Sequence, residues 1–261
     1  MGERIIGRAK SLLRTLGLGR RGEAYEALIS LGGLCQVAYQ VEKRFGFRIK
    51  SPFDWLVTPL GAIERVLTDD GAGFGQSVTM QFDGGTAVCD RYGVAHHHDF
   101  PRTADYKAMV SAEALEACRA KHLHKYRSFI DFMRKGRRTV FIRLGGHLES
   151  PAPHPYVADP KTVETEDLNR LCRTLEAKFP GLSFTLAFVY YEAFTPVAID
   201  PAALDPRVRV FALPTHPQSD WMGDTGAWGA IFDQLRIAIP DRANTACQFG
   251  EETREMEVMH A

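Results

Sequence analysis

Four short apolar segments, separated by stretches of helical periodicity, constrain the fold of this chain more than any other feature. They cover residues 27–31, 139–144, 184–191 and 208–213. The third segment is apolar along almost its whole length, which is typical of a parallel strand that is covered on both faces. The alternation predicts an α/β fold, a three-layer sandwich with a mostly parallel sheet, whose ligand site would lie beyond the carboxyl ends of the strands.

The segments between these strands predict an inserted β-hairpin and a set of helices. Residues 77–82 alternate in polarity, Asp83-Gly84-Gly85 is a typical hairpin turn, and residues 86–89 have the pattern of the returning strand. Thr58 is a suitable N-cap for a short helix that would end near residue 67. Helical periodicity predicts the other helices at about 34–45, 103–134, 163–178 and 225–235.

Length and composition limit the class of protein. The 261 residues are enough for one large domain, which we place at residues 23–243. The formal net charge is zero, so we expect no nucleic-acid partner. Five scattered cysteines without CxxC spacing argue against a disulfide framework and a zinc finger, and they favour a reduced, cytoplasmic location. The chain lacks a run of about 18 apolar residues, so no transmembrane helix is predicted.

The two ends of the chain differ in composition from the predicted domain. Residues 1–22 carry six basic residues and one acidic residue, with apolar residues on one helical face, which predicts a basic amphipathic helix. Such a helix either packs on its own domain with its charges in water or makes a peripheral membrane contact through residues 1–21. Residues 244–261 are predicted to form a polar tail.

Cys35 is the leading candidate for a reactive side chain. It follows the first apolar segment across a glycine turn, Gly32-Gly33, and falls in the first turn of the predicted helix. The amide groups and the positive dipole end of that helix are expected to lower the pKa of the thiol, whose thiolate is the nucleophile. The glycines would leave room for a substrate and offer N–H groups to an oxyanion. The alternative is a buried structural cysteine in an ordinary strand–turn–helix.

Residues 96–99, His-His-His-Asp, form the densest group of ionisable side chains in the chain. Adjacent residues on an extended segment point to opposite sides, so at most two of the four, such as His96 and His98, could share a metal ion. A helical pair of the HExxH type does not accompany them, and we predict neither a metal site nor a cofactor. The remaining interpretations are a single histidine acting as general base and an exposed polar loop.

Three further side chains, Arg143, Asp54 and Asp224, are candidates for the functional site. The charged residues at 121–127 are not. Arg143, near the end of the second parallel strand, is a candidate contact for an anion. Asp54 lies between two aromatic residues and is either a hydrogen-bonded loop anchor or the group that orients a catalytic histidine. Asp224 or Thr225 is the natural N-cap of the last helix. The lysines, histidines and arginine of residues 121–127 are predicted to lie on a solvated helix face.

Four short motifs follow one another along the chain. They are Ser30-Leu31-Gly32-Gly33-Leu34-Cys35, Ser51-Pro52-Phe53-Asp54-Trp55, His98-Asp99-Phe100 and Val140-Phe141-Ile142-Arg143. Together they resemble a bacterial family of unknown function that is labelled papain-like cysteine peptidase. The first two motifs carry most of the specificity of this resemblance. Members of that family often occur beside, or fused to, glycosyltransferases of surface-polysaccharide synthesis.

The resemblance implies roles for particular residues. Cys35 would be the nucleophile and His98 its base, and the third member would be Asp54 as first choice or Asp224 as second. The remaining predicted site residues are substrate contacts, namely Gly33, Gln36, Asp99 and Arg143. The resemblance also implies a papain-like α+β fold, which is the alternative to the sandwich that the alternation of strands and helices predicts.

These observations predict a cysteine hydrolase that performs acyl transfer on a peptide, an amide or an ester carried by a glycan. A link to surface-polysaccharide synthesis follows from the resemblance alone. One alternative is a non-catalytic accessory module that binds a sugar-phosphate or a glycosyltransferase partner. Another is a transferase acting on a nucleotide sugar, and the lack of a phosphate-cradling glycine motif weighs against it.

Overall fold

The computed structural model describes residues 24–46, 48–81, 83–145, 147–148, 156–157, 162–193, 195–214 and 221–237. The predicted basic helix of residues 1–22 and the predicted polar tail of residues 244–261 lie outside the described residues. Within the described part of the chain, every helix is too short or too polar to cross a membrane.

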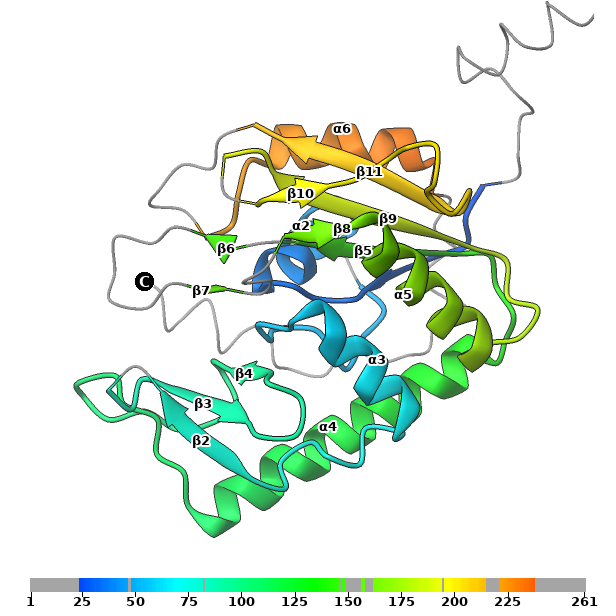
Figure 1. The fold of residues 1–261 in the computed structure, drawn as a ribbon. Helices are drawn as coiled ribbons and strands as arrows, with labels where there is room; N and C mark the ends of the chain where they lie inside the picture. Colours follow the sequence, from blue (N-terminus) through cyan, green and yellow to red (C-terminus); the bar gives the residue numbers. More distant parts are fainter. Residues whose placement is uncertain are drawn as a thin grey trace, which may run out of the picture.

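A four-stranded parallel sheet lies at the centre of the protein (Figure 1). Its strands lie side by side in the order β1 (Ala27–Ser30), β5 (Thr139–Leu144), β9 (Phe184–Tyr191) and β11 (Val208–Leu213). All three neighbouring pairs are parallel, and each of the four apolar segments has formed one strand. The predicted α/β class with a mostly parallel sheet is therefore confirmed.

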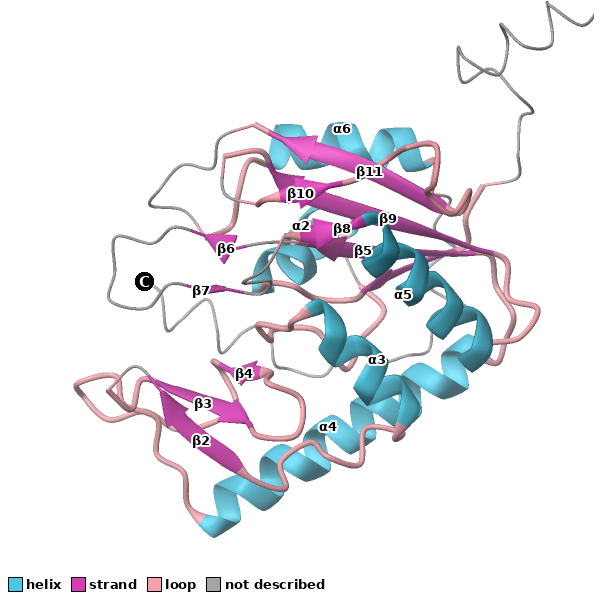
Figure 2. Cartoon of the chain, in the orientation of Figure 1, coloured by secondary structure: helices cyan, strands magenta, loops and turns pink. Residues whose placement is uncertain are grey.

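Helices lie against both faces of the sheet (Figure 2). One face is covered by α2 (Cys35–Phe45) and α6 (Thr225–Leu235). The other face is covered by α3 (Leu60–Thr68), α4 (Ala112–Met133) and α5 (Thr165–Lys178). Because both faces are covered, the strands can be apolar on both sides, as the sequence of β9 shows.

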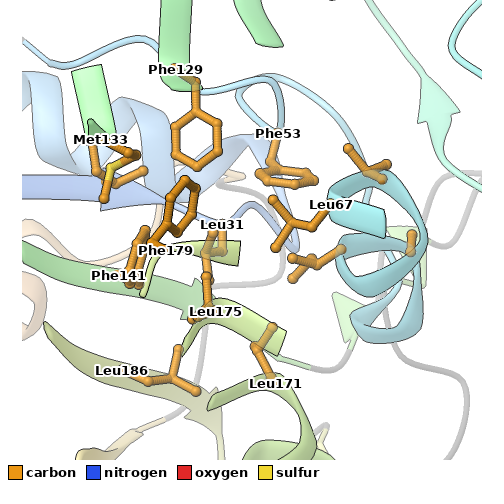
Figure 3. Packing of buried hydrophobic residues seen from close by; sticks show 14 of the residues in the cluster. Leu31, Phe53, Leu67, Phe129, Met133, Phe141, Leu171, Leu175, Phe179 and Leu186 are labelled. Carbon is orange, nitrogen blue, oxygen red and sulfur yellow. The ribbon is translucent and has the colours of Figure 1, made fainter. Parts of the chain in front are cut away.

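The larger half of the core lies between the sheet and α3, α4 and α5 (Figure 3). Successive side chains of a strand point to opposite faces, so Phe141 enters this half while its neighbour Val140 packs with α2 and α6. The ring of Phe179, which follows α5, lies 6.4 Å from the Phe141 ring and 5.6 Å from the Phe129 ring of α4. These aromatic contacts fix α4 and α5 against the same face of the sheet.

A three-stranded antiparallel sheet is inserted between α3 and α4 and lies beside the amino-terminal part of α4 (Figure 1). Its strands are β2 (Val78–Gln81), β3 (Thr86–Cys89) and β4 (Ala95–His96). The predicted hairpin is thus confirmed as β2 and β3. Two shorter pairs complete the described strands: β6 (His147–Leu148) with β7 (Tyr156–Val157), and β8 (Val163–Glu164) with β10 (Val197–Ala198).

The predicted start of the long helix is wrong. α4 begins at Ala112 rather than at residue 103, because the side chain of Ser111 caps the helix by accepting a hydrogen bond from its first turn. The guanidinium group of Arg102 holds the preceding segment in a loop. It donates hydrogen bonds to three backbone carbonyl groups, those of Gly85, His97 and Tyr106.

The turn between β1 and α2 is packed directly against the end of β5. The Leu144 amide donates to the Gly32 carbonyl group (3.2 Å), and the Thr58 amide donates to the Gly33 carbonyl group (3.0 Å). Gly33 has a φ angle of +99°, and a Cβ atom there would lie 1.8 Å from the Leu144 carbonyl oxygen. Only glycine fits this position. Thr58 belongs to this contact and does not cap α3, which has no side-chain cap.

We expect Gly33→Ala to lower the free energy of unfolding by more than about 3 kcal/mol, because the turn must move away from β5 and also adopt a strained φ angle. The matched control is Gly181→Ala, whose φ angle is +80° but whose Cβ would meet no atom within 4 Å. In the control variant the free energy of unfolding should fall by only roughly 1–2 kcal/mol, which is the cost of a left-handed backbone conformation for a residue with a side chain. Urea unfolding of both variants measures the difference, and equal losses would contradict the close approach.

Candidate functional site

Cys35 is the first residue of α2 and lies just beyond the carboxyl end of β1. The helix has Leu34 as its N-cap residue, and no side chain caps its first turn. Cys35 is partly exposed, whereas the three other cysteines of the described chain are buried. The structure therefore places this thiol at the edge of the sheet where ligands bind in α/β proteins, as the sequence predicts.

The predicted depression of the thiol pKa is not present in this structure. Burial raises the pKa of Cys35 to about 12, and the charges of Asp99 and Asp54 act in the same direction. The backbone amide of Cys35 itself, at the start of the helix, acts to lower the pKa but is outweighed. The helix N-terminus is thus present, but the dense packing around the sulfur atom favours the neutral thiol.

The two carboxylates considered as third catalytic residue both have local structural contacts. Asp54 is buried, and its Oδ2 accepts hydrogen bonds from Arg48 Nη1 (2.7 Å) and the Ser51 amide (2.8 Å). These contacts support the interpretation of Asp54 as a loop anchor. Asp224 is exposed and caps α6, because its Oδ1 accepts a hydrogen bond from the Ala227 amide (2.8 Å). A catalytic role for either one stays a prediction.

The segment that carries His98 lies beside the loop that carries Asp54. Val57 and Ala95 exchange two backbone hydrogen bonds, with N–O distances of 3.1 and 2.9 Å. The His98 ring lies edge-on to the Trp55 ring, with 6.0 Å between the ring centroids. The structure therefore brings together two of the four motifs that lie more than forty residues apart in sequence.

Aromatic side chains form a group around the start of α2 that the sequence analysis did not predict. The Trp221 ring lies 6.1 Å from the Trp55 ring and 5.3 Å from the Tyr39 ring. We call Tyr39, Trp55, His98 and Trp221 the aromatic rim, and all four are partly or fully exposed. Nothing in the local sequence links these residues, because they come from four separate segments.

Gln36 holds the aromatic rim to the sheet through its buried side chain. Its Nε2 donates to the Trp221 carbonyl group (2.8 Å), and its Oε1 accepts hydrogen bonds from Tyr191 (2.7 Å) and Trp228 (3.2 Å). The side-chain amide therefore has a structural role, which leaves the backbone amide as the part of Gln36 that could meet an oxyanion.

Arg143 is fully buried beneath the turn between β1 and α2. Its Nη1 donates to the Leu31 carbonyl group at 3.5 Å and lies 3.3 Å from the position of a Cβ atom on Gly33. The guanidinium group has no access to solvent in this structure. The predicted anion contact would require the Gly32–Gly33 turn to move, and this turn is fixed by its contact with β5.

Asp99 takes part in a buried network that the sequence analysis missed. Its Oδ2 lies 2.7 Å from His96 Nδ1 and 2.8 Å from His122 Nε2, and its Oδ1 lies 3.3 Å from the Lys121 ammonium nitrogen. Although burial acts to raise it, the pKa of Asp99 is held well below its ordinary value by the charges and hydrogen bonds of His122 and His96. The contacts of Asp99 are internal and differ from the predicted substrate contact.

The prediction of a solvated face for residues 121–127 is wrong in part. His122 is fully buried, because Phe74, His96 and Asp99 contact its ring, and Lys125 is nearly buried as well. One signal was available in the sequence. Cys118 and His122 are four residues apart, and this spacing places both side chains on the same face of a helix.

A comparison of the chain with protein-family models found no match, and comparisons with curated proteins and with solved structures found no significant match. The resemblance to papain-like cysteine peptidases therefore stays a prediction. The geometry of the site carries the functional argument.

We expect Cys35 to react slowly with iodoacetamide at neutral pH. With a pKa of about 12 instead of 9.0, the fraction of Cys35 present as thiolate at neutral pH is about 1,000-fold lower. A more basic thiolate is intrinsically more nucleophilic, and this recovers a factor of roughly 15 to 30 in the reaction rate. The rate should rise about tenfold per pH unit from pH 7 to 10, because only the thiolate reacts.

Peptide mapping by mass spectrometry measures this rate for each cysteine. Cys172 is the internal control, since burial raises its pKa to about 12 as well but leaves it no exposure. It should react only after the protein unfolds. A rate for Cys35 that reaches a plateau near pH 8 would contradict the raised pKa and agree with the depressed pKa that the sequence predicts.

Proposed function

We propose that this protein is a cysteine-dependent acyl-transfer enzyme, a hydrolase in which Cys35 is the nucleophile and His98 is the general base. The observation that carries the proposal is the position of Cys35, partly exposed at the start of α2 and beyond the carboxyl end of β1. The backbone pairing of Val57 with Ala95, which places the His98 segment at the same edge, supports it.

The raised pKa of Cys35 determines how the chemistry would begin. A thiol that stays protonated must lose its proton as it attacks, so a base is needed in the same step. His98 would accept that proton while the Cys35 sulfur forms a bond to the carbonyl carbon of the substrate. Backbone amide groups of Gly33 to Gln36 would stabilise the oxyanion.

Attack of the sulfur on the carbonyl carbon gives a tetrahedral intermediate. When this intermediate collapses, the bond to the leaving group breaks and His98 returns the proton to the leaving group. Water, deprotonated by His98, would then attack the acyl group on Cys35 and release the free acid and the thiol. This order of events needs no preformed thiolate and uses one histidine as base and as acid.

The aromatic rim suggests the class of substrate. Flat aromatic faces pack well against apolar groups and against the C–H faces of sugar rings. An ester or amide carried by a glycan fits such a surface, and a peptide is the other substrate in our proposal. The resemblance adds a link to surface-polysaccharide synthesis. For the fold of this enzyme we propose a three-layer α/β sandwich rather than a papain-like α+β fold.

A second candidate function is a non-catalytic module that binds a sugar-phosphate or a glycosyltransferase. It is favoured by the neutral state of the Cys35 thiol and by the structural contacts of Asp54. In this function the aromatic rim would bind the ligand, and Cys35 would take no part in chemistry.

The test uses p-nitrophenyl acetate as a general activated ester, with acid quenching and mass spectrometry to locate the acetyl group. We expect an acetyl adduct on Cys35 that is absent in Cys35→Ala. In His98→Ala the adduct should form roughly 100-fold more slowly, because a general base typically contributes a factor of this size or more. His97→Ala is the matched control and should change the rate by less than about twofold.

Each outcome distinguishes one part of the proposal. A normal rate of adduct formation in His98→Ala would contradict the role of His98 as base. Failure to form any adduct on Cys35 in the folded wild-type protein would contradict the nucleophile. The binding function would then predict that a sugar-phosphate raises the melting temperature equally in wild type and in Cys35→Ser.

A further inference from the structure

Four side chains of different chemistry converge at one buried point between β4 and α4. His96, Asp99, Cys118 and His122 each direct one donor atom there, and these four atoms lie within 4.8 Å of one another. Two of the residues belong to the segment that begins with β4. The other two are one turn apart on α4.

The donor atoms are those that a zinc ion binds. They comprise two imidazole nitrogens, a carboxylate oxygen and a thiol sulfur, and the spacing of three residues in one pair and four in the other is common in structural zinc sites. Tetrahedral zinc with bonds of about 2.0–2.3 Å separates its ligand atoms by roughly 3.3–3.8 Å. Cys118 Sγ lies 3.6 Å from His96 Nδ1, and the Asp99 oxygen lies 2.7 and 2.8 Å from the two histidines. Since the four atoms lie within 4.8 Å of one another, tetrahedral spacing would require shifts of the ligand atoms of up to about 1 Å, with the Asp99 oxygen moving away from the two histidines.

Burial makes this a closed site. His96 and His122 are fully buried, Cys118 is 2% exposed, and the Asp99 side chain is 5% exposed. Four protein ligands without access for water are typical of a structural zinc ion rather than a catalytic one. A thiolate and a carboxylate would together neutralise the charge of the ion, which a buried site requires.

Packing fixes the orientation of the two imidazole rings. The Phe74 ring stacks on His122 with a centroid distance of 4.8 Å and an interplanar angle of 23°. The Phe100 ring lies edge-on to His96 at 6.0 Å. His96 Nε2 and His122 Nδ1 meet no hydrogen-bond geometry among the described residues, and the Cys89 thiol is a further neighbour of the His96 ring. The nitrogens that face Asp99 are thereby aimed at the point of convergence.

We propose that this protein binds one structural zinc ion through His96 Nδ1, Asp99 Oδ2, Cys118 Sγ and His122 Nε2. Binding would release the thiol proton of Cys118 and the Nδ1 proton of His96 to solvent, and the neutral His122 ring would keep its proton on Nδ1 instead of Nε2. Bonds to the metal would replace the internal hydrogen bonds of Asp99. The ion would join α4 to the segment that follows β4. The proposal goes beyond the acyl-transfer function and is independent of any reaction at Cys35.

The experiment measures metal content in the full-length protein, purified without chelators and without a histidine tag. We expect about one zinc ion per chain in wild type and at least a tenfold lower content in Cys118→Ser, because the hydroxyl group is a much poorer ligand than the thiolate. Cys172→Ser is the matched control, since Cys172 is also a fully buried cysteine on a helix, and it should keep the full zinc content.

A second measurement keeps the proposal testable if Cys118→Ser does not fold. Wild-type protein is stripped of metal and titrated with Co²⁺, which should give the strong visible bands of tetrahedral cobalt and a thiolate-to-cobalt charge-transfer band at one equivalent. Removal of zinc should also lower the melting temperature by roughly 10 °C.

The two measurements separate the outcomes. The site is supported if wild type binds one equivalent of zinc or tetrahedral cobalt and if Cys118 is shown to be a ligand. Either loss of the metal in Cys118→Ser or a thiolate-to-cobalt band in wild type would show this. A wild-type protein that takes up neither metal overturns it, and the cluster is then a hydrogen-bonded network. Full zinc content in a folded Cys118→Ser variant, without a thiolate band in wild type, also overturns this ligand set.

Discussion

The contact between the Gly33 backbone and the carbonyl group of Leu144 sets the position of the whole carboxyl edge of the sheet. It joins the turn before α2 to the end of β5 at a distance that leaves no space for a side chain. From this turn, backbone hydrogen bonds continue to Thr58 and then from Val57 to Ala95. Backbone contacts have no rotamers to adjust, so Cys35, the loop that bears Trp55 and the His98 segment are fixed in relation to one another, and the Gln36 side chain adds Trp221 to them.

Buried charges in this region hold loops in place. The ion pair between Asp54 and Arg48 fixes the loop that bears Trp55, because a buried carboxylate without partners would be costly. Asp99 fixes the segment after β4 in the same way, through His96 and His122. A charged residue near the end of a strand can therefore be fully engaged in internal contacts, and its position alone does not show that it is available to a substrate.

The fold class could be predicted from the sequence because it depends on local patterns. The four strands are apolar segments whose burial the periodicity reveals, and the hairpin strands pair on either side of the predicted turn. The start of α4 could not be predicted so well, because Arg102 and Ser111 override the helical pattern of residues 103–111. That override depends on carbonyl groups that become neighbours only in the folded chain.

The candidate site was predictable in position but not in electrostatics. The strand–turn–helix pattern around Cys35 correctly placed the thiol at the start of a helix. The pKa of the thiol depends instead on how densely other segments cover it and on carboxylates such as Asp99, which come from distant parts of the chain. The burial of His122 had the same origin, since Phe74, His96 and Asp99, which contact its ring, come from other segments of the chain.

The two proposals meet in the segment that follows β4. His96 and Asp99 would bind zinc, and His98, which lies between them in sequence, would act at Cys35. A carboxylate bound to zinc no longer presents its full negative charge, so the metal would remove one of the two charges that raise the pKa of Cys35. Burial, the larger cause, would remain. The Cys35 thiol would therefore still need a base, and an ion that holds the His98 segment in place would serve that need.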